Sequence, residues 1–284
     1  LQTDNLMSQK EAKRISKIDP IDVAFVMPFL TGAFPGFYKW DSDTLIKLAN
    51  DKISKSLNYC TNTIKNLNPK YVVPYACDLG YLGEQSYINL IHRHNKEDLV
   101  KIVKLKKLKT KPILLNPGDY IDISNKFKLN LKNKRKISKS ESLVRFANEK
   151  NNEFKRYKNI EKRVKKPNIN ELTKKFSNYL SKNMKFIKKF NYEVIISIVE
   201  ENKKKFILLN FKNKNLKIIK KKKEKVNLFI EIESTKIRNL FLQKYPMNFL
   251  TFHNGGFTCE RKIMNLSSSE IKYWSWINNL DFFI

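Results

Sequence analysis

Two residues near the end of the chain have side chains that could form a nucleophilic pair. His253 and Cys259 lie on either side of the Gly-Gly pair in the segment FHNGGFTCERK, and a neighbouring histidine can deprotonate a cysteine thiol. A working pair also needs a residue that orients the histidine and groups that bind an oxyanion, and neither can be read from this segment. The pattern therefore favours a strand, a turn and a second strand with satisfied polar groups.

The remaining histidines and cysteines do not have the spacing of a metal site. His92 and His94 are two positions apart on a predicted helix, so their side chains point in different directions. The chain has three cysteines, Cys60, Cys77 and Cys259. Their odd number argues against a disulfide framework, and their spacing argues against a cysteine-based zinc site. A reducing compartment is the default for such a chain, and we expect a cytoplasmic protein.

More informative residues follow two apolar runs of strand length. The runs IDVAFVMP and YVVPYA each lead through a proline into a glycine-rich or aromatic loop, and the second loop contains Asp78 and Glu84. If the two runs are neighbouring strands of one sheet, both loops face the same edge, where open α/β sheets bind ligands. The sequence therefore predicts a site there. Asp78 could contact the ligand or cap its own turn, and Glu84 could accept a substrate hydroxyl or cap a turn.

These loops belong to a β-α-β-α-β pattern, which favours helices packed on a sheet. Ser8 and Glu11 form a capping box that opens a short helix before the first apolar run. A long helix with one apolar face begins near Asp41 or Ser42 and ends at Pro69. A basic helix over about 86–108 then leads to the third apolar run, KPILLNPGDYID.

The pattern divides the chain into three parts. Residues 1–125 form the α/β domain, 126–168 form a basic linker or connecting helix, and 169–284 form a smaller α+β accessory domain. The accessory domain is predicted as a helix, a β-meander of three strands and two further helices, an arrangement that loosely resembles sterol-carrier modules in shape alone. The basic run Lys217 to Lys225 is predicted as a charged hairpin tip, with contact to phosphate or an anionic surface as the alternative.

The composition predicts a folded chain with a large excess of lysine. Hydrophobic residues make up 41% and aromatic residues 12% of the 284, which is enough for a core. The formal net charge is +30, but only 8 of the 57 basic residues are arginine, the side chain whose planar fork binds phosphate. The lysine excess therefore indicates a compositional bias, and nucleic acid is a partner that we do not favour. No apolar run approaches the roughly 18 residues of a membrane-spanning helix.

The segments LQTDN, VMPF, YVVPYACDLGYLGE and LLNPGD resemble the second half of metallo-β-lactamase-fold proteins, in the branch that includes CMP-N-acetylneuraminate hydroxylase-like proteins. The resemblance covers about 120 residues. It implies the second half of an αββα sandwich, with metal ligands on loops at one edge. It implies that Asp4 ligates the metal, and Asp78 is the nearest further oxygen donor, suited to zinc, iron or manganese. Without the resemblance, a turn or N-cap role before the helix at Ser8 is favoured for Asp4.

The sequence also departs from this family. The motif His-x-His-x-Asp-His, which carries the family's first metal ligands, does not occur, so the metal site cannot be complete. Because the sequence begins at Leu1 rather than Met, we expect a chain whose beginning is missing.

The resemblance implies a metal-dependent hydrolase that acts on an anionic small molecule or a sugar or lipid conjugate, such as a sugar nucleotide. In that reaction a metal-bound water attacks an electrophilic carbon or phosphorus. Two alternatives stay open: a CMP-sialic-acid hydroxylase-like oxidoreductase, which would need iron and an electron donor, and a non-enzymatic basic protein that binds nucleic acid or anionic glycan.

Overall fold

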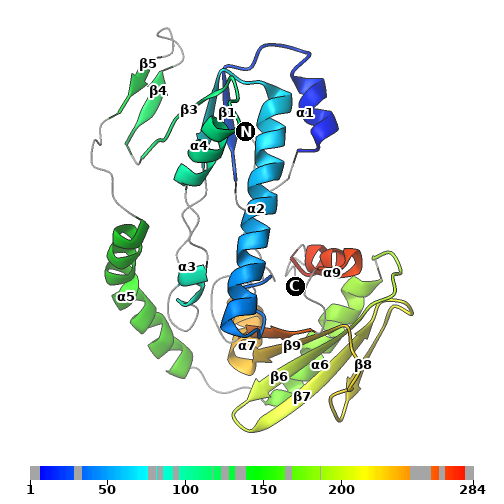
Figure 1. Cartoon of the computed structure of the whole chain (residues 1–284). Coiled ribbons are helices and arrows are strands. Elements are labelled where there is room, and N and C mark those ends of the chain that lie inside the picture. The colour runs from blue at the N-terminus through cyan, green and yellow to red at the C-terminus, as the bar shows by residue number, and fades with distance from the viewer. Residues whose placement is uncertain are drawn as a thin grey trace. The chain divides into compact units, whose positions relative to one another are not determined.

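The computed structural model describes most of the chain, which divides into two compact units (Figure 1). The described residues are 7–28, 34–75, 81, 86–91, 96–116, 118–122, 128–131, 139–163, 168–185, 187–243, 257–261 and 266–278. Unit 1 comprises Leu1–Thr31, Ala49–Leu82 and Ser86–Asn152, and unit 2 comprises Gly32–Leu48, Gly83–Gln85 and Glu153–Ile284. Both helices and strands occur, which confirms the predicted mixed class of α and β structure.

Unit 1 contains a parallel sheet in the order β1-β2-β3 and a separate two-stranded hairpin. Its strands are β1 (Val23–Val26), β2 (Tyr71–Pro74), β3 (Lys111–Pro112), β4 (Tyr120–Asp122) and β5 (Lys128–Asn130). Its helices are α1 (Gln9–Ile15), α3 (Ile88–Ile91) and α4 (Lys96–Leu105), while α2 (Ser42–Leu67) and α5 (Lys139–Arg163) each contribute residues to both units. The two apolar runs after which the sequence placed a site are therefore neighbouring parallel strands.

Local sequence signals explain several of these boundaries. The Ser8 hydroxyl accepts a hydrogen bond from the backbone N–H of Glu11, whose carboxylate accepts one from the N–H of Ser8, which confirms the predicted capping box. Where the sequence predicts one basic helix over 86–108, the structure describes two helices, α3 and α4, and 92–95 between them lie outside the described residues. Glu97 and Asp98 in the first turn of α4 favour a new helix N-terminus there.

The core of unit 1 lies on one face of its sheet. Side chains alternate along a strand, and the register pairs Ala24 with Val72, so these two residues point to the same face. They form one apolar cluster with residues of three helices, α1, α2 and α4: Ala12, Cys60, Ile64, Leu67, Leu99 and Val103. On the opposite face Val23, Phe25 and Tyr71 are partly exposed, although Val73 is buried. These three helices therefore cover the same side of the sheet.

Unit 2 is a five-stranded sheet in the order β10-β9-β6-β7-β8 with helices packed against it. The strands are β6 (Glu193–Glu200), β7 (Lys203–Asn210), β8 (Asn215–Ile219), β9 (Leu228–Glu233) and β10 (Phe257–Glu260). The helices are α6 (Ile169–Met184), α7 (Ser234–Gln243) and α9 (Ser268–Asn278). Strands β6, β7 and β8 form antiparallel pairs, whereas β9 pairs with β6 in parallel.

Two predictions for this region are wrong in detail. The third strand of the predicted meander is β9, which crosses over to pair with β6 instead of following β7. Lys217, predicted at a hairpin tip, lies within β8 and pairs with Leu208. Because β8 is at the edge of the sheet, it needs no continuous apolar run, and lysine on an edge strand discourages further pairing.

Candidate functional site

The residues singled out for metal binding lie outside the part of the chain that the structure describes. This holds for Asp4 and Asp78, and likewise for Glu84, His92, His94 and His253. Among the described residues, no three His, Cys, Asp or Glu side chains are grouped closely enough to hold a metal ion. No helix among them is both long and apolar enough to cross a membrane.

Cys259, the proposed nucleophile of the alternative pair, is fully buried in β10. Burial raises the pKa of its thiol well above the ordinary value, and the nearby Glu270 carboxylate raises it further. The thiol therefore stays protonated at neutral pH and is shielded from solvent. The strand expected around it is present as β10, paired with β9.

The carboxyl edge of the β1-β2-β3 sheet is formed by the residues that follow each strand. After β2, the N–H of Tyr75 donates a hydrogen bond to the carbonyl of Val26, with 3.0 Å between nitrogen and oxygen. After β1, the carbonyl of Pro28 accepts a hydrogen bond of 2.6 Å from the hydroxyl of Ser56 on α2. This hydrogen bond places Ser56 of α2 beside the carboxyl end of β1.

Lys52 lies one helical turn before Ser56 and on the same face of α2. In a β-α-β unit the helix runs antiparallel to the strands, so the turn before Ser56 projects past the carboxyl edge. Lys52 is half-buried, and burial lowers the pKa of its ammonium group from 10.5 to about 8. The group is thus a desolvated cation at neutral pH, a kind of residue that occurs often in functional sites.

Lys96 places a second cation at the same edge, beyond β3. Its ammonium group donates to the side-chain Oδ1 of Asn116 at 2.8 Å and to the carbonyl of Leu115 at 3.4 Å. Both acceptors are neutral, so these contacts orient the cation without cancelling its charge. Asn116 is held in turn by Asp119, whose carboxylate accepts from the Asn116 N–H, across a turn in which Gly118 adopts a φ of 91° that glycine tolerates.

Unit 2 has a polar centre of a different kind, built around the buried carboxylate of Glu270 on α9. It accepts hydrogen bonds from the hydroxyl of Tyr38 at 2.5 Å and of Tyr192 at 2.8 Å, and it forms an ion pair with the guanidinium of Arg261. The Arg261 and Glu270 side chains are only 2% and 3% exposed. The indole of Trp274 donates to the Tyr38 hydroxyl at 2.9 Å.

This centre attaches the segment from Phe34 to Trp40 to unit 2. The N–H of Cys259 donates to the carbonyl of Phe37 and the N–H of Lys39 donates to the carbonyl of Cys259, so the segment pairs with β10. Burial raises the pKa of the Tyr38 phenol far above its ordinary value, and the Glu270 charge adds to this. Tyr38 is therefore a structural anchor and not an acid or base. The segment is therefore packed within unit 2.

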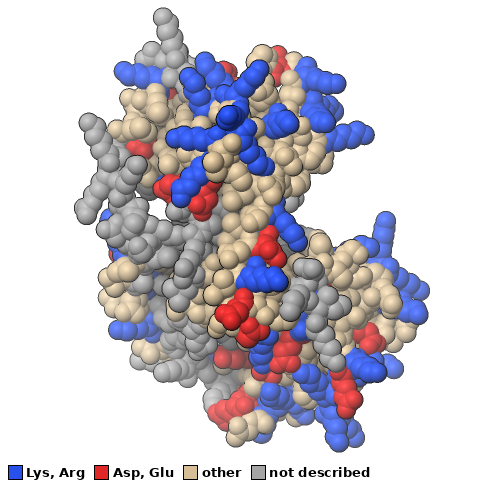
Figure 2. Space-filling model, viewed as in Figure 1, with Lys and Arg blue, Asp and Glu red and all other residues tan. Residues whose placement is uncertain are grey.

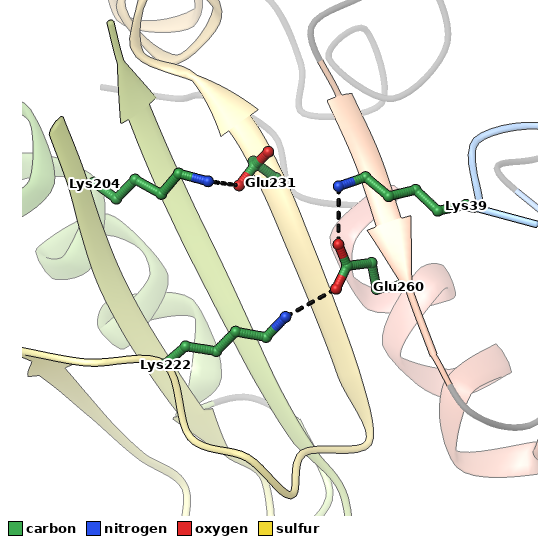
Figure 3. A network of polar contacts seen from close by, with 5 residues as sticks. All are labelled: Lys39, Lys204, Lys222, Glu231 and Glu260. Atoms are coloured by element: carbon green, nitrogen blue, oxygen red, sulfur yellow. Dashed lines mark hydrogen bonds and ion pairs between the residues drawn. The ribbon is translucent and has the colours of Figure 1, made fainter. Parts of the chain in front are cut away.

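Some lysines of unit 2 are paired with glutamate (Figure 3). Glu260 accepts from Lys39 and from Lys222, each at 2.8 Å, and Glu231 accepts from Lys204 at 2.6 Å. Hydrogen bonds from the two lysines lower the pKa of Glu260. Because these ion pairs are partly exposed, each contributes little to stability.

Elsewhere the basic side chains are widely spread. In the space-filling view, lysine and arginine occur over much of the visible face, and acidic side chains lie among them in several places (Figure 2). A surface that grips nucleic acid concentrates its charge in one patch or stripe. On this face the spread of charge agrees with a compositional bias, as the excess of lysine over arginine indicates.

Comparison with known proteins gives little further information. No family model matches the chain, and no curated protein matches it. One similar solved structure is sterol carrier protein 2-like-3 from Aedes aegypti, with a TM-score of 0.28 and 12% identity, covering 36% of this chain and 95% of the other. Another is apo sterol carrier protein 2 from Yarrowia lipolytica, with a TM-score of 0.23 and 13% identity, covering 37% and 80%. TM-scores this low support no conclusion about fold or function.

The buried ion pair should be essential to unit 2. Glu270→Gln leaves the Arg261 charge without its partner in an apolar environment, which should lower the free energy of unfolding by about 3–5 kcal/mol. Urea unfolding followed by tryptophan fluorescence would measure this, since Trp274 reports on the same cluster. The matched change Glu231→Gln, in an exposed ion pair of the same unit, should cost no more than about 1 kcal/mol. Equal effects of the two substitutions would contradict the assignment.

Lys52 should make stability depend on alkaline pH. Its folded pKa is below its unfolded value, so the unfolded chain binds more protons between pH 8 and 10.5, and stability rises with pH over that range. Lys52→Met should therefore raise the free energy of unfolding at pH 7 by about 1–3 kcal/mol and flatten this rise. Urea unfolding at pH 7.0 and 9.5 would test both effects, with the exposed Lys55→Met on the same helix as control. An unchanged pH dependence in the Lys52 variant would refute the prediction.

Proposed function

We propose that the chain functions as a metal-dependent hydrolase of metallo-β-lactamase-like fold and that its reaction takes place at the carboxyl edge of the β1-β2-β3 sheet. The supporting observation is the parallel register of β1 and β2, which runs from Val23 opposite Tyr71 to Val26 opposite Pro74. The chain therefore leaves both strands at the same edge, and Asp78 follows the last residue of β2, Pro74, by four positions in the sequence. Such an edge is the position at which open α/β sheets bind ligands.

The one-sided packing of unit 1 also supports this fold. In an αββα sandwich, each sheet has helices on its outer face and meets a second sheet on its inner face. Helices α1, α2 and α4 share one side of the β1-β2-β3 sheet, and Val23, Phe25 and Tyr71 on the other side are partly exposed. We propose that this second face is the one that meets the other half of the sandwich.

The attachment of α1 to α2 bears on the role of Asp4. The Tyr59 hydroxyl donates to the carbonyl of Met7 at 2.5 Å, and the side chain of Gln9 donates to Thr63. The earlier residue, Met7, contacts the residue of α2 that is nearer the N-terminus of this helix. The N-terminal part of α2 is the part that lies toward the carboxyl edge of the sheet. Met7 is thus held against α2 within about one turn of Ser56. Asp4 precedes Met7 by three residues in the sequence and lies outside the described residues.

Two aspartates alone do not fit a complete site, because zinc sites in proteins use at least three protein ligands. Asp4 and Asp78 would supply hard oxygen donors for zinc, iron or manganese, and further donors would be required beyond the described residues. The ion, when bound, would provide the activated water of hydrolysis.

Metal binding by the purified chain tests this proposal. Titration calorimetry with Zn²⁺ and with Mn²⁺ should show binding that Asp4→Asn and Asp78→Asn each weaken by about tenfold or more, because each substitution removes an anionic ligand. The exposed Asp19→Asn and Asp22→Asn serve as matched controls and should leave the affinity unchanged. Binding that all four substitutions affect equally, or no binding by the unsubstituted chain, would overturn the proposal.

A further inference from the structure

We propose that β8 is a docking edge, on which an acidic, extended segment of a partner protein adds as a further strand of the unit 2 sheet. The edge belongs to unit 2, so the proposal is independent of the hydrolase reaction proposed for unit 1. Strand addition of this kind takes its affinity from backbone hydrogen bonds and its specificity from alternate side chains.

The two edges of the five-stranded sheet differ in what covers them. The edge strand β10 is paired with the segment from Phe34 to Trp40, through the N–H of Lys39 and the carbonyl of Phe37. Among the described residues, the other edge strand, β8, pairs with β7 alone, and Figure 1 shows it at the margin of the sheet. Within this part of the chain, the outer side of β8 is therefore open to another strand.

The pairing of β7 determines which backbone groups of β8 point outward. The N–H of Phe211, directly after β7, donates to the carbonyl of Tyr192, directly before β6. Hydrogen-bonded and non-hydrogen-bonded pairs alternate along antiparallel strands, so the odd-numbered residues of β7 bond to β6 and the even-numbered residues bond to β8. Lys217 is opposite an even-numbered residue, so its backbone groups are used within the sheet. Those of its neighbours Leu216 and Ile218 point away from β7, and no group of the described residues hydrogen-bonds to them.

The surroundings of this edge are strongly basic. Lysine accounts for 11 of the 23 residues from Lys203 to Lys225, against 49 of all 284, so the local density exceeds the general lysine excess. The same range holds one carboxylate, Glu224. Lys217, Lys220 and Lys221 are exposed, and among the described residues no acidic side chain forms an ion pair with them. Charge without a partner in this part of the chain therefore lies along β8 and directly after it.

This charge decides which kind of strand can pair with β8. A second copy of the chain would bring its own lysines against those of β8, and like charges on facing strands destabilise the pairing. An acidic strand replaces that repulsion with attraction. Nucleic acid and anionic lipid match the charge but carry no peptide groups that could pair with Leu216 and Ile218. We therefore commit to an acidic segment of a protein.

The side chains of β8 predict the sequence pattern of the partner. Successive side chains alternate between faces, so Lys217 and Ile218 point to opposite faces of the sheet, and Ile218 is 52% exposed. Directly opposite residues on paired strands share a face. The partner residue opposite Lys217 should therefore be acidic and the one opposite Ile218 apolar, which describes a strand of alternating acidic and β-branched residues.

The docking edge is tested with a fluorescein-labelled peptide of alternating glutamate and valine. Its binding to the full chain is followed by fluorescence anisotropy in about 150 mM salt, which screens binding due to net charge alone. Ile218→Pro removes an outward N–H that the sheet does not use, and proline is tolerated at such edge positions. It should weaken the affinity about tenfold or more, as expected for a lost backbone hydrogen bond. Ile218→Ala keeps the N–H and should weaken the affinity less than about threefold.

The role of the charge is measured with a second pair of variants. Lys217→Glu replaces an attraction with a repulsion and should weaken the affinity about tenfold. The control Lys55→Glu changes the net charge by the same amount at an exposed position of α2 and should change the affinity less than about twofold. Thermal unfolding of every variant shows whether its fold is kept.

Two N-methylated peptides test the backbone pairing without any change to the protein. Methylation of the valine amides blocks one edge of the peptide strand, methylation of the glutamate amides blocks the other, and only one edge can face β8. One methylated peptide should therefore bind like the parent peptide, and the other should lose its binding.

Other results would overturn the docking edge. If both methylated peptides bind equally, or if a glutamate-proline peptide that cannot form a strand binds as tightly as the parent, net charge alone holds the peptide. If the chain self-associates and Ile218→Pro abolishes this, the edge is an interface between copies. If an oligonucleotide or phosphatidylserine vesicles displace the peptide and also bind the Ile218→Pro variant unchanged, the basic surface serves a polyanion or a membrane.

Discussion

The parallel hydrogen-bonded ladder between β1 and β2 is the constraint on which the arrangement of unit 1 depends. It sets which side chains enter the core, since Ala24 and Val72 must share a face, and it also sets which loops share an edge. A slip of one residue would turn the apolar side chains of β1 toward the other face and move the Pro28 carbonyl away from Ser56. The packing of α2 and the position of Lys52 are therefore consequences of one register.

Unit 2 depends instead on a buried charge. Taking a carboxylate and a guanidinium out of water is costly, and their attraction compensates only when the remaining hydrogen-bonding capacity is used. Glu270 meets this condition through two tyrosine hydroxyls and Arg261. Because these donors come from separate parts of the chain, the carboxylate specifies how they assemble. The exposed lysine and glutamate pairs on the same unit have no comparable role.

The features that the sequence predicted correctly are those that depend on residues close together in the chain. The capping box at Ser8, the long helix from Ser42 and the strands β1 and β2 all follow from patterns within a few residues. Strand β8 was missed because an edge strand can carry lysine at positions where a central strand must be apolar. The parallel return of β9 to β6 depends on tertiary pairing, which a run of apolar residues does not reveal.

The sites were less predictable than the elements. Lys52 is one of many lysines in the sequence, and only its burial in the folded chain distinguishes it. The partners Tyr38 and Glu270 are 232 positions apart, so no spacing rule could join them. The ligand roles of Asp4 and Asp78 rest on resemblance and remain proposals, because both residues lie outside the described part of the chain.

The 232 positions between Tyr38 and Glu270 have a consequence for biosynthesis. The ribosome makes the segment around Tyr38 long before β10 and α9. Until these two elements have been made, the aromatic side chains of the segment lack the partners that they contact in the folded unit. Contacts between such distant positions also slow folding, since a long loop must close before they form. Unit 2 can therefore be completed only after α9 has been synthesised.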